Sequence, residues 1–514
     1  MAQKSLPLFN WLTDRGAGVL LHPTSLPGDF GIGTLGREAR RFIDFLAGAG
    51  MAYWQICPLG PTSFGDSPYQ GPSAFAGNPY LIDVMALCEH GLVREDTLGP
   101  LLFLPQDSVD FGGIYKLKRP ILRKACEKFV SAKKQTQRYG DFSKFKQENA
   151  AWLEPFAYFQ ALKDHFGGRS WIEWPAEFVN FSPATKAGLR SQLSAEIEAQ
   201  QFYQYLFFGQ WREIHDYAKQ RGVSIIGDIP IFVALDSADV WANPGLFQFD
   251  REKHRPIAVA GCPPDYFSAD GQLWGNPLYD WEALANDGYA WWLARLKMCF
   301  EMCDVVRIDH FRGFDSYWSI PAGSITAREG EWKRGPGIGF FEAVQEHFPL
   351  AKIIAEDLGE ITDDVRALLH NTGLPGMAVL QFAFGGKADN LYLPHNLIAN
   401  QVLYPGTHDN DTTRGWYDSA GAALQDHVRR YLRVSGEETG WDFIRTSYAA
   451  VSRLAIFSLQ DLLSLGGNAR FNTPGIAQGN WSWRYGADQL DSLRRQGAGY
   501  LRELGGLFDR LPRA

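Results

Sequence analysis

The stretch DVVRIDHFRGF, residues 304–314, has the apolar character of a buried strand but carries charges in its middle. Val305, Val306 and Ile308 are β-branched residues, which are common in strands. A fully apolar strand of this kind is typical of a parallel sheet that is covered on both faces. We therefore expect this segment to be a central strand of an α/β protein.

Arg307 and Asp309 interrupt that apolar run, and such residues are almost never fully buried unless they are paired. Side chains two positions apart on a strand share a face, so Arg307 and Asp309 should point one way, and Ile308 and His310 the other. An arginine beside an aspartate favours the ionised carboxylate. A carboxylate that acts as a nucleophile must be ionised, and Asp309 is therefore a candidate nucleophile.

Seven further short apolar runs resemble this one, and helical patterns lie between several of them. The eight candidate strands lie within residues 18–28, 52–61, 222–233, 303–311, 351–359, 376–384, 400–410 and 453–463. Amphipathic patterns predict helices over residues 37–50 and 362–373, the second one capped by Thr362. Eight such strand and helix units predict a (β/α)₈ TIM barrel.

The units are unevenly spaced, which predicts large inserted subdomains. About 160 residues separate the second and third strands, far more than an ordinary connection. The polar, helical patterns of this connecting segment predict a mostly helical inserted lobe over residues 85–200. A second insertion, residues 234–281, is rich in Gly, Pro, Asp and aromatic residues, and we expect it to form a loop subdomain over the active site. The whole chain, 1–514, is then one catalytic barrel with insertions.

Composition excludes several classes of function. The 514 residues carry a net charge of −8 and show no basic run, so a nucleic-acid partner is not expected. No stretch of 18 apolar residues predicts a membrane span. The first residues lack an apolar signal core, and the six cysteines show no paired spacing. Both observations favour a cytoplasmic protein with reduced thiols.

Acidic residues recur where other candidate strands end. Glu356 follows a strand in IIAEDLG, His408 and Asp409 follow one in YPGTHDND, and Asp228 lies near the end of IIGDIPIF. Helix capping after a strand would explain any one of these acids alone. Four such strand ends around one arginine are better explained by a catalytic site, because the active sites of such barrels lie at this end.

Possible cofactor and metal motifs occur in the sequence, but the residues around them do not match what such sites require. GIGTLG, residues 31–36, fits GxGxxG, but it does not directly follow a strand and no acidic residue ends the next strand. Cys299 and Cys303 have no matching pair of zinc ligands nearby. Acid clusters often bind metal ions, yet the adjacent Arg307 argues against a dication at Asp309. We expect no cofactor and no metal.

Two carboxyl groups that flank one bond, one ionised and one protonated, are what glycoside chemistry requires. Asp309, paired with Arg307, suits attack on the anomeric carbon. Glu356 has no cation next to it in the sequence and suits the general acid, which needs a raised pKa.

Several segments of the chain resemble the motifs of a known family. The four strand-end segments, GDIPIFV, VVRIDHFRGF, IIAEDLG and YPGTHDND, resemble the four motif regions of the α-amylase superfamily. Three longer motifs look like those of the amylomaltases, the disproportionating 4-α-glucanotransferases of glycoside hydrolase family 77: SFGDSPYQGPSAFAGNPYLID (63–83), PPDYFSADGQLWGNPLYDW (263–281) and ARFNTPG (469–475). The resemblance covers nearly the whole chain.

The resemblance implies roles for individual residues. Asp309 would be the nucleophile, Glu356 the acid/base and Asp409 a third carboxylate that binds sugar hydroxyls. The substrate-binding residues would be Arg307, His408, Tyr69, Trp274, Gln272, Asp228 and His310. Ordinary loop packing is the alternative for Tyr69 and Trp274. Phe64 stands where relatives often carry a tyrosine, which puts a secondary glucan site there in doubt.

The resemblance also implies the reaction and its partners. Segments of α-1,4-glucan from maltodextrins, starch or glycogen would pass to another glucan or to glucose, and transfer within one chain would give cyclic glucans. Two other functions stay open: an amylase-like hydrolase and an inactive glucan-binding protein. The products formed from maltotriose distinguish the three. The implied protein is a monomer or small homo-oligomer, in a short form without added N-terminal starch-binding modules.

Overall fold

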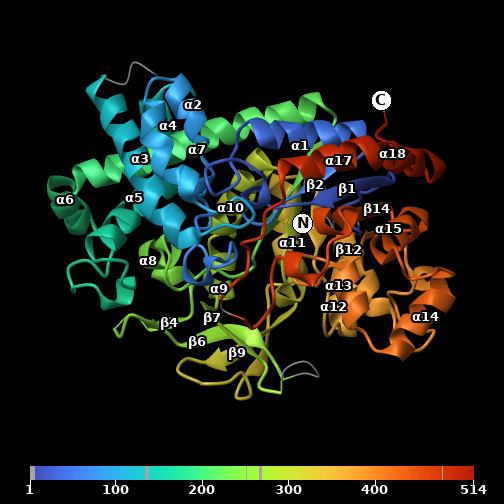
Figure 1. Ribbon diagram of the computed structural model, residues 1–514. Coiled ribbons are helices and arrows are strands. Elements are labelled where there is room, and N and C mark those ends of the chain that lie inside the picture. The colour runs from blue at the N-terminus through green and yellow to red at the C-terminus, as the bar shows by residue number, and fades with distance from the viewer. Residues whose placement is uncertain (1–5, 133–137, 251, 265–268, 477, 514) are drawn as a thin grey trace.

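The computed structural model describes residues 6–132, 138–250, 252–264, 269–476 and 478–513, and its centre is an eight-stranded parallel sheet (Figure 1). The strands are β1 Gly16–Leu20, β2 Tyr53–Gln55, β3 Ser224–Ile229, β8 Val305–Ile308, β11 Ile353–Ala355, β12 Gly376–Val379, β13 Gln401–Tyr404 and β14 Leu454–Ser458. Their order in the sheet is β11-β8-β3-β2-β1-β14-β13-β12. All eight predicted strands are confirmed.

The two outer strands of this sheet meet and close it into a barrel. The backbone N–H of Ala355, the last residue of β11, donates a hydrogen bond of 2.9 Å to the carbonyl of Pro375. Pro375 directly precedes β12. The (β/α)₈ barrel expected from the sequence is therefore the fold of the chain.

Burial explains why the strands are apolar. In β8, Val305 is 1% exposed, and Val306 and Ile308 are fully buried. Strands of a barrel contact its interior on one face and the surrounding helices on the other, so both faces are covered. The charged Arg307 is also buried in this strand, with 3% exposure, and its partners are described with the site below.

Helices surround the barrel and fill its long connections. They are α1 Arg37–Gly48, α2 Val84–Glu89, α3 Phe111–Ser131, α4 Phe142–Glu148, α5 Ala150–His165, α6 Pro183–Gln192, α7 Ser194–Gln220, α8 Ala238–Ala242, α9 Trp281–Asn286, α10 Ala290–Met302, α11 Ile338–His347, α12 Asp363–Thr372, α13 Thr413–Ser419, α14 Ala422–Leu432, α15 Thr439–Ala449, α16 Leu459–Leu462, α17 Ala487–Gln496 and α18 Ala498–Leu507. No helix within the described ranges is long and apolar enough to cross a lipid bilayer.

Two of these helices were predicted from their patterns. In α1 the apolar stripe of Phe42, Ile43 and Leu46 is fully buried. Thr362 caps α12 as expected, because its side chain accepts a hydrogen bond from the backbone N–H of Val365. Both helices are confirmed to within two residues at each end.

The segment between β2 and β3 is helical, as the sequence analysis expected. Helices α2 to α7 lie in it, and α3 to α6 project from one side of the barrel (Figure 1). The last of them, α7, continues past residue 200 to Gln220 and leads into β3. It packs against both α1 and α5, so it joins the helical segment to the barrel. The division of the chain into an inserted lobe and a barrel stays a prediction.

The other insertion is built on a small antiparallel sheet. Its strands are β6 Ala258–Cys262, β7 Gln272–Pro277, β9 Ser316–Pro321 and β10 Glu331–Arg334, in the order β10-β9-β6-β7, beside the short pair β4 Phe249–Asp250 and β5 Arg255–Pro256. Residues 265–268 of the motif that contains β7 lie outside the described residues. Strands β9 and β10 follow β8, a contribution that the sequence analysis missed.

This sheet lies at the end of the barrel that is formed by the carboxyl ends of its strands. Strands β6 and β7 follow the carboxyl end of β3, and strands β9 and β10 follow the carboxyl end of β8. Figure 1 shows β6, β7 and β9 together below the barrel. The loops at the carboxyl ends of barrel strands form the active site in this fold, so the sheet forms part of the wall of the site.

Candidate active site

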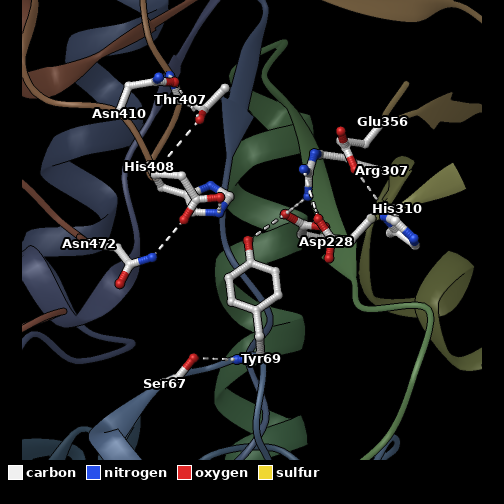
Figure 2. Close-up of polar contacts among 12 residues, drawn as sticks. Ser67, Tyr69, Asp228, Arg307, His310, Glu356, Thr407, His408, Asn410 and Asn472 are labelled. Carbon is white, nitrogen blue, oxygen red and sulfur yellow. Dashed lines mark hydrogen bonds and ion pairs between the residues drawn. The ribbon is translucent and has the colours of Figure 1, made fainter. Parts of the chain in front are cut away.

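An ion-pair chain joins three residues at the ends of β3 and β8. Arg307 Nη1 lies 2.8 and 2.6 Å from the two carboxylate oxygens of Asp228, and Arg307 Nη2 lies 2.9 Å from Asp309 Oδ1. Figure 2 shows the first contact. Asp228 and Arg307 are partners in the register of β3 and β8. The sequence analysis expected the pairing with Asp309 but not the one with Asp228.

The two carboxylate partners of Arg307 explain how this arginine can be buried. The side chains of Arg307 and Asp228 are 3% and 1% exposed, whereas that of Asp309 is 30% exposed. A buried charge is tolerated when it is paired and its hydrogen bonds are satisfied. The negative charge of the buried Asp228 neutralises the guanidinium of Arg307. The same guanidinium also pairs with Asp309, which is more exposed.

The backbone turns immediately after β8, which corrects one expectation from the sequence. The strand ends at Ile308, and His310 has φ 54° and ψ 51°, in the left-handed region. The strict alternation of faces therefore does not extend to His310. Its backbone N–H points instead to Glu356, with a hydrogen bond of 2.7 Å to Oε2 (Figure 2).

Glu356 follows β11 and is held by two backbone donors. Its Oε1 accepts a hydrogen bond of 2.8 Å from Leu358, and its Oε2 accepts the one from His310. Burial, reinforced by the negative charge of Asp309, raises the pKa of Glu356 to about 7, although Arg307 opposes the shift. A carboxyl group with this pKa can carry a proton near neutral pH and can donate it to a leaving group.

A second carboxylate centre lies beyond β13. His408 Nε2 lies 3.3 Å from Asp409 Oδ2, and Asn472 Nδ2 donates a hydrogen bond of 2.6 Å to Asp409 Oδ1 (Figure 2 shows Asn472 beside His408). Burial opposes ionisation of Asp409, but His408 and Asn472 outweigh it and hold its pKa below the usual range. The side chain of Asp409 is 46% exposed, so an ionised carboxylate faces solvent here.

Tyr69 connects the two centres. Its hydroxyl donates a hydrogen bond of 2.8 Å to Asp228 Oδ2, and its ring stacks on His408 with 5.1 Å between ring centroids and 20° between ring planes. Figure 2 shows Tyr69 between Asp228 and His408. Burial raises the pKa of Tyr69 well above its usual value, so the phenol stays protonated and acts as a donor.

Trp274 and Gln272 approach the site from β7. Trp274 Nε1 donates a hydrogen bond of 3.0 Å to Gln272 Oε1. The Trp274 ring lies edge-on to His310, with 5.0 Å between centroids and 87° between planes. Burial lowers the pKa of His310 to about 4, so this imidazole is neutral at neutral pH.

Most of the residues predicted for the site are thus brought together by direct contacts. Arg307 contacts both Asp228 and Asp309, and the backbone N–H of His310 joins the turn after Asp309 to Glu356. Tyr69 contacts Asp228 and His408, and His408 contacts Asp409. Sequence reasoning missed Asn472 and Arg470, whose guanidinium donates to the carbonyl of Asp409. The signal for both was the motif ARFNTPG, which contains them. The side chain of Phe64 lies outside the described residues.

The geometry of the described residues suits glycoside chemistry. No group of three or more His, Cys, Asp or Glu within the described part of the chain is arranged to hold a metal ion. Asp309 is paired with a cation, and the pKa of Glu356 is raised. One ionised and one protonated carboxyl group at a shared site are the pair that cleavage of a glycosidic bond uses.

Comparisons with known proteins agree with this chemistry. Residues 21–489 match the model of glycoside hydrolase family 77, which is described as 4-alpha-glucanotransferase. A 4-alpha-glucanotransferase of Thermus thermophilus is 48% identical over 478 residues, which cover 91% of this chain and 94% of the relative. One of Streptococcus pneumoniae serotype 4 is 47% identical over 487 residues, with 94% and 95% covered. A solved structure of an amylomaltase from Streptococcus agalactiae in complex with acarbose has a TM-score of 0.92 and 40% identity, and covers 96% of this chain and 99% of its own.

Proposed function

Because the chain belongs to glycoside hydrolase family 77, the 4-alpha-glucanotransferases, we propose that it transfers segments of α-1,4-glucan between maltodextrins or to glucose. The donors would be maltodextrins derived from starch or glycogen. The proposed mechanism rests on the different surroundings of two carboxyl groups. Asp309 is paired with buried Arg307, and Glu356 has a pKa raised to about 7.

In the first step, a carboxylate oxygen of Asp309 attacks the anomeric carbon of the donor chain. The bond from that carbon to the glycosidic oxygen breaks, and the oxygen takes the proton of Glu356 as the reducing-end fragment leaves. The product is a glucosyl ester on Asp309 with inverted configuration at the anomeric carbon. Arg307, paired with Asp309, places a positive charge beside this carboxylate before the attack.

In the second step, the 4-hydroxyl of an acceptor sugar gives its proton to the Glu356 carboxylate. The hydroxyl oxygen attacks the same anomeric carbon and releases Asp309, so the configuration is retained overall. Transfer within one long chain would give a cyclic glucan by the same step. Glu356 acts once as acid and once as base, which requires a pKa near the working pH.

We assign supporting roles from exposure and contacts. Asp409, ionised and half-exposed beside His408, would accept hydrogen bonds from sugar hydroxyl groups. Asp228 is almost fully buried and contacts Arg307 and Tyr69. Its burial favours a positioning role through Arg307 over the direct substrate contact that the sequence analysis expected.

Trp274, Gln272 and His310 would line the side of the cleft under the small sheet. Trp274 contacts His310 next to the nucleophile, so its indole is placed to shield the ester on Asp309 from water. Such shielding is what separates transfer from hydrolysis, since both reactions pass through the same ester. An acceptor sugar would displace the water that a hydrolase admits.

The decisive experiment is the product profile on maltotriose. A transferase forms glucose and a ladder of longer maltodextrins, with almost no net gain of reducing ends. A steady gain of reducing ends would instead identify a hydrolase. Unchanged maltotriose, despite measurable binding, would identify a glucan-binding protein without activity.

We further propose that the protein acts in the cytoplasm as a monomer or small homo-oligomer. Cys57 and Cys303 are buried thiols that form no disulfide, as is usual in a reducing compartment. Light scattering coupled to size-exclusion chromatography measures the oligomeric state directly. A large assembly would contradict that part of the proposal.

A further inference from the structure

Trp332 differs from the other tryptophans of the chain in its exposure. The chain has 17 tryptophans, all within the described residues, and Trp332 is the exposed one, at 40%. The others are buried or half-buried. A large aromatic side chain left at the surface is informative when its position and surroundings are organised, because exposed apolar groups often mark binding sites.

The indole of Trp332 is held rigidly from one side. The guanidinium carbon of Arg312 lies 3.8 Å from the centroid of its ring. Trp318, its partner in the register of β9 and β10, meets it edge-on with 5.1 Å between centroids and 68° between planes. Trp318 is itself tied by a hydrogen bond of 2.9 Å from its Nε1 to the carbonyl of Ala327. With Arg312 against one face, the exposed area of Trp332 lies on the rest of the ring.

A ring held in this way is prepared for stacking. A ligand that packs on it does not have to immobilise the side chain, so binding costs less conformational entropy. Trp332 also makes no hydrogen bond within the described part of the chain that would occupy its indole N–H. The flanking residues Glu331 and Lys333 form an ion pair of 3.1 Å and point to the opposite face of the strand. The charged group that lies on the ring itself is the guanidinium of Arg312, and an aromatic face beside such a group suits a ligand with apolar faces and polar edges.

Trp332 is connected to both catalytic loops. Arg312 follows the nucleophile Asp309 by three residues, a backbone span of at most about 11 Å. The same guanidinium donates a hydrogen bond to the carbonyl of Glu360, in the loop that follows Glu356. Strand β10 also belongs to the sheet that carries Trp274 on β7. The exposed ring therefore lies at the edge of the site, outside the residues that surround the reacting bond.

We propose that Trp332 forms a remote subsite for α-1,4-glucan, on which an outer glucose unit of a long chain stacks while the reacting bond lies between Asp309 and Glu356. The C–H face of a glucose ring matches the free part of the indole. This inference rests on the proposed function, because it assumes that the chain in the cleft is a glucan. A short substrate such as maltotriose ends before the subsite, and a long maltodextrin reaches it.

The test compares substrates of two lengths in the full-length enzyme. KM is measured for maltotriose and for a maltodextrin of about 20 glucose units, and the ratio of the two values is used because it does not depend on the fraction of active enzyme. In Trp332→Ala, KM for the long substrate should rise about fivefold relative to maltotriose, which corresponds to about 1 kcal/mol. Trp332→Phe keeps an aromatic face, and its ratio should change by less.

Two controls separate binding from packing. Ile325, in the turn between β9 and β10, is 94% exposed, and Ile325→Ala should leave both KM values as in the wild type. Thermal unfolding of each variant reports any loss of packing on Arg312. If the KM ratio is unchanged in Trp332→Ala, whatever the thermal midpoint of the variant, the proposed subsite is wrong. Trp332 then only packs on Arg312.

A failure of the proposed function would look different. In that case the wild-type enzyme itself would give no ladder from maltotriose. If the wild type gives the ladder and the KM ratio does not respond to Trp332, the reaction stands and the subsite does not.

Discussion

The backbone N–H of His310 donates a hydrogen bond of 2.7 Å to the carboxyl group of Glu356. His310 follows Asp309, the proposed nucleophile, directly and has a left-handed backbone conformation that is uncommon for a residue other than glycine. The turn after β8 thus links Asp309 to Glu356, the proposed acid on the loop after β11. One short turn therefore helps to fix the position of both proposed reacting groups.

The raised pKa of Glu356 predicts how activity depends on pH. A pKa of about 7 means that the carboxyl group stays protonated below neutral pH and loses its proton as the pH rises through 7. The first step needs that proton, so kcat/KM for maltotriose should fall above pH 7 with an apparent pKa near this value. Initial rates over a pH series measure it. The same series with α-glucosyl fluoride, whose leaving group needs no proton, should lack this fall, and a shared fall would contradict the assignment.

Substitution of the two carboxyl groups should have distinguishable effects. Asp309→Asn removes the nucleophile, so activity should fall at least about 10⁴-fold, as it does when the nucleophile of another enzyme is removed. Glu356→Gln should lose about 10²- to 10⁴-fold on maltotriose, yet α-glucosyl fluoride should still load Asp309. Mass spectrometry of peptides from the denatured protein detects the ester. Glu360→Gln, an exposed acid on the same loop, serves as the control, and labelling of Asp309→Asn but not of Glu356→Gln would reverse the roles.

The buried pair of Asp228 and Arg307 predicts a loss of stability. Asp228→Asn leaves the guanidinium without its buried counterion, and breaking a buried pair costs about 3–5 kcal/mol. Urea unfolding followed by tryptophan fluorescence should show this decrease in the free energy of unfolding. Tyr69→Phe removes one hydrogen bond to the same carboxylate and should cost about 1–3 kcal/mol. A fully stable Asp228→Asn variant would show that Arg307 does not depend on this partner.

The position of Trp274 predicts a change in the balance of products. In Trp274→Ala, the ester on Asp309 loses a neighbour that excludes water, so transfer should decrease more than hydrolysis. Ladder formation and release of reducing ends are measured in the same maltotriose sample. Leu273→Ala, at the adjacent and exposed position on β7, is the matched control. An unchanged ratio with a lower thermal midpoint would mean that Trp274 only packs the loop.

The pairing of Asp309 with Arg307 predicts resistance to chelation, because a cation already lies beside this carboxylate. The acids at the site are expected to act on sugar, so dialysis against EDTA should leave the rate on maltotriose unchanged. The control is the same dialysis without chelator. A loss of activity that added Ca²⁺ restores would contradict this expectation.

Local pattern was sufficient to predict the strands of this protein and to propose its main reacting groups. Apolar runs such as the one in β8 report burial on both faces, which depends on the residues themselves and their immediate surroundings. Asp309 and Glu356 could be identified because each directly follows such a run. The pairing of Arg307 with Asp309 was also predictable, since the two are neighbours on one strand.

What only the tertiary structure decided are the contacts between segments far apart in the chain. Asp228 meets Arg307 because β3 and β8 pair in one particular register, and a pattern within either strand does not determine that register. Asn472 contacts Asp409, which lies 63 residues earlier in the sequence. Strands β9 and β10 join β6 and β7 in one sheet, although the barrel strand β8 lies between β7 and β9 in the sequence. The sequence by itself determined which segments form the buried strands, and it supplied the candidates for the reacting residues. The physical reason for the division is that the apolar character of a segment is local and predicts its burial, whereas the partners of a residue depend on how distant segments pack.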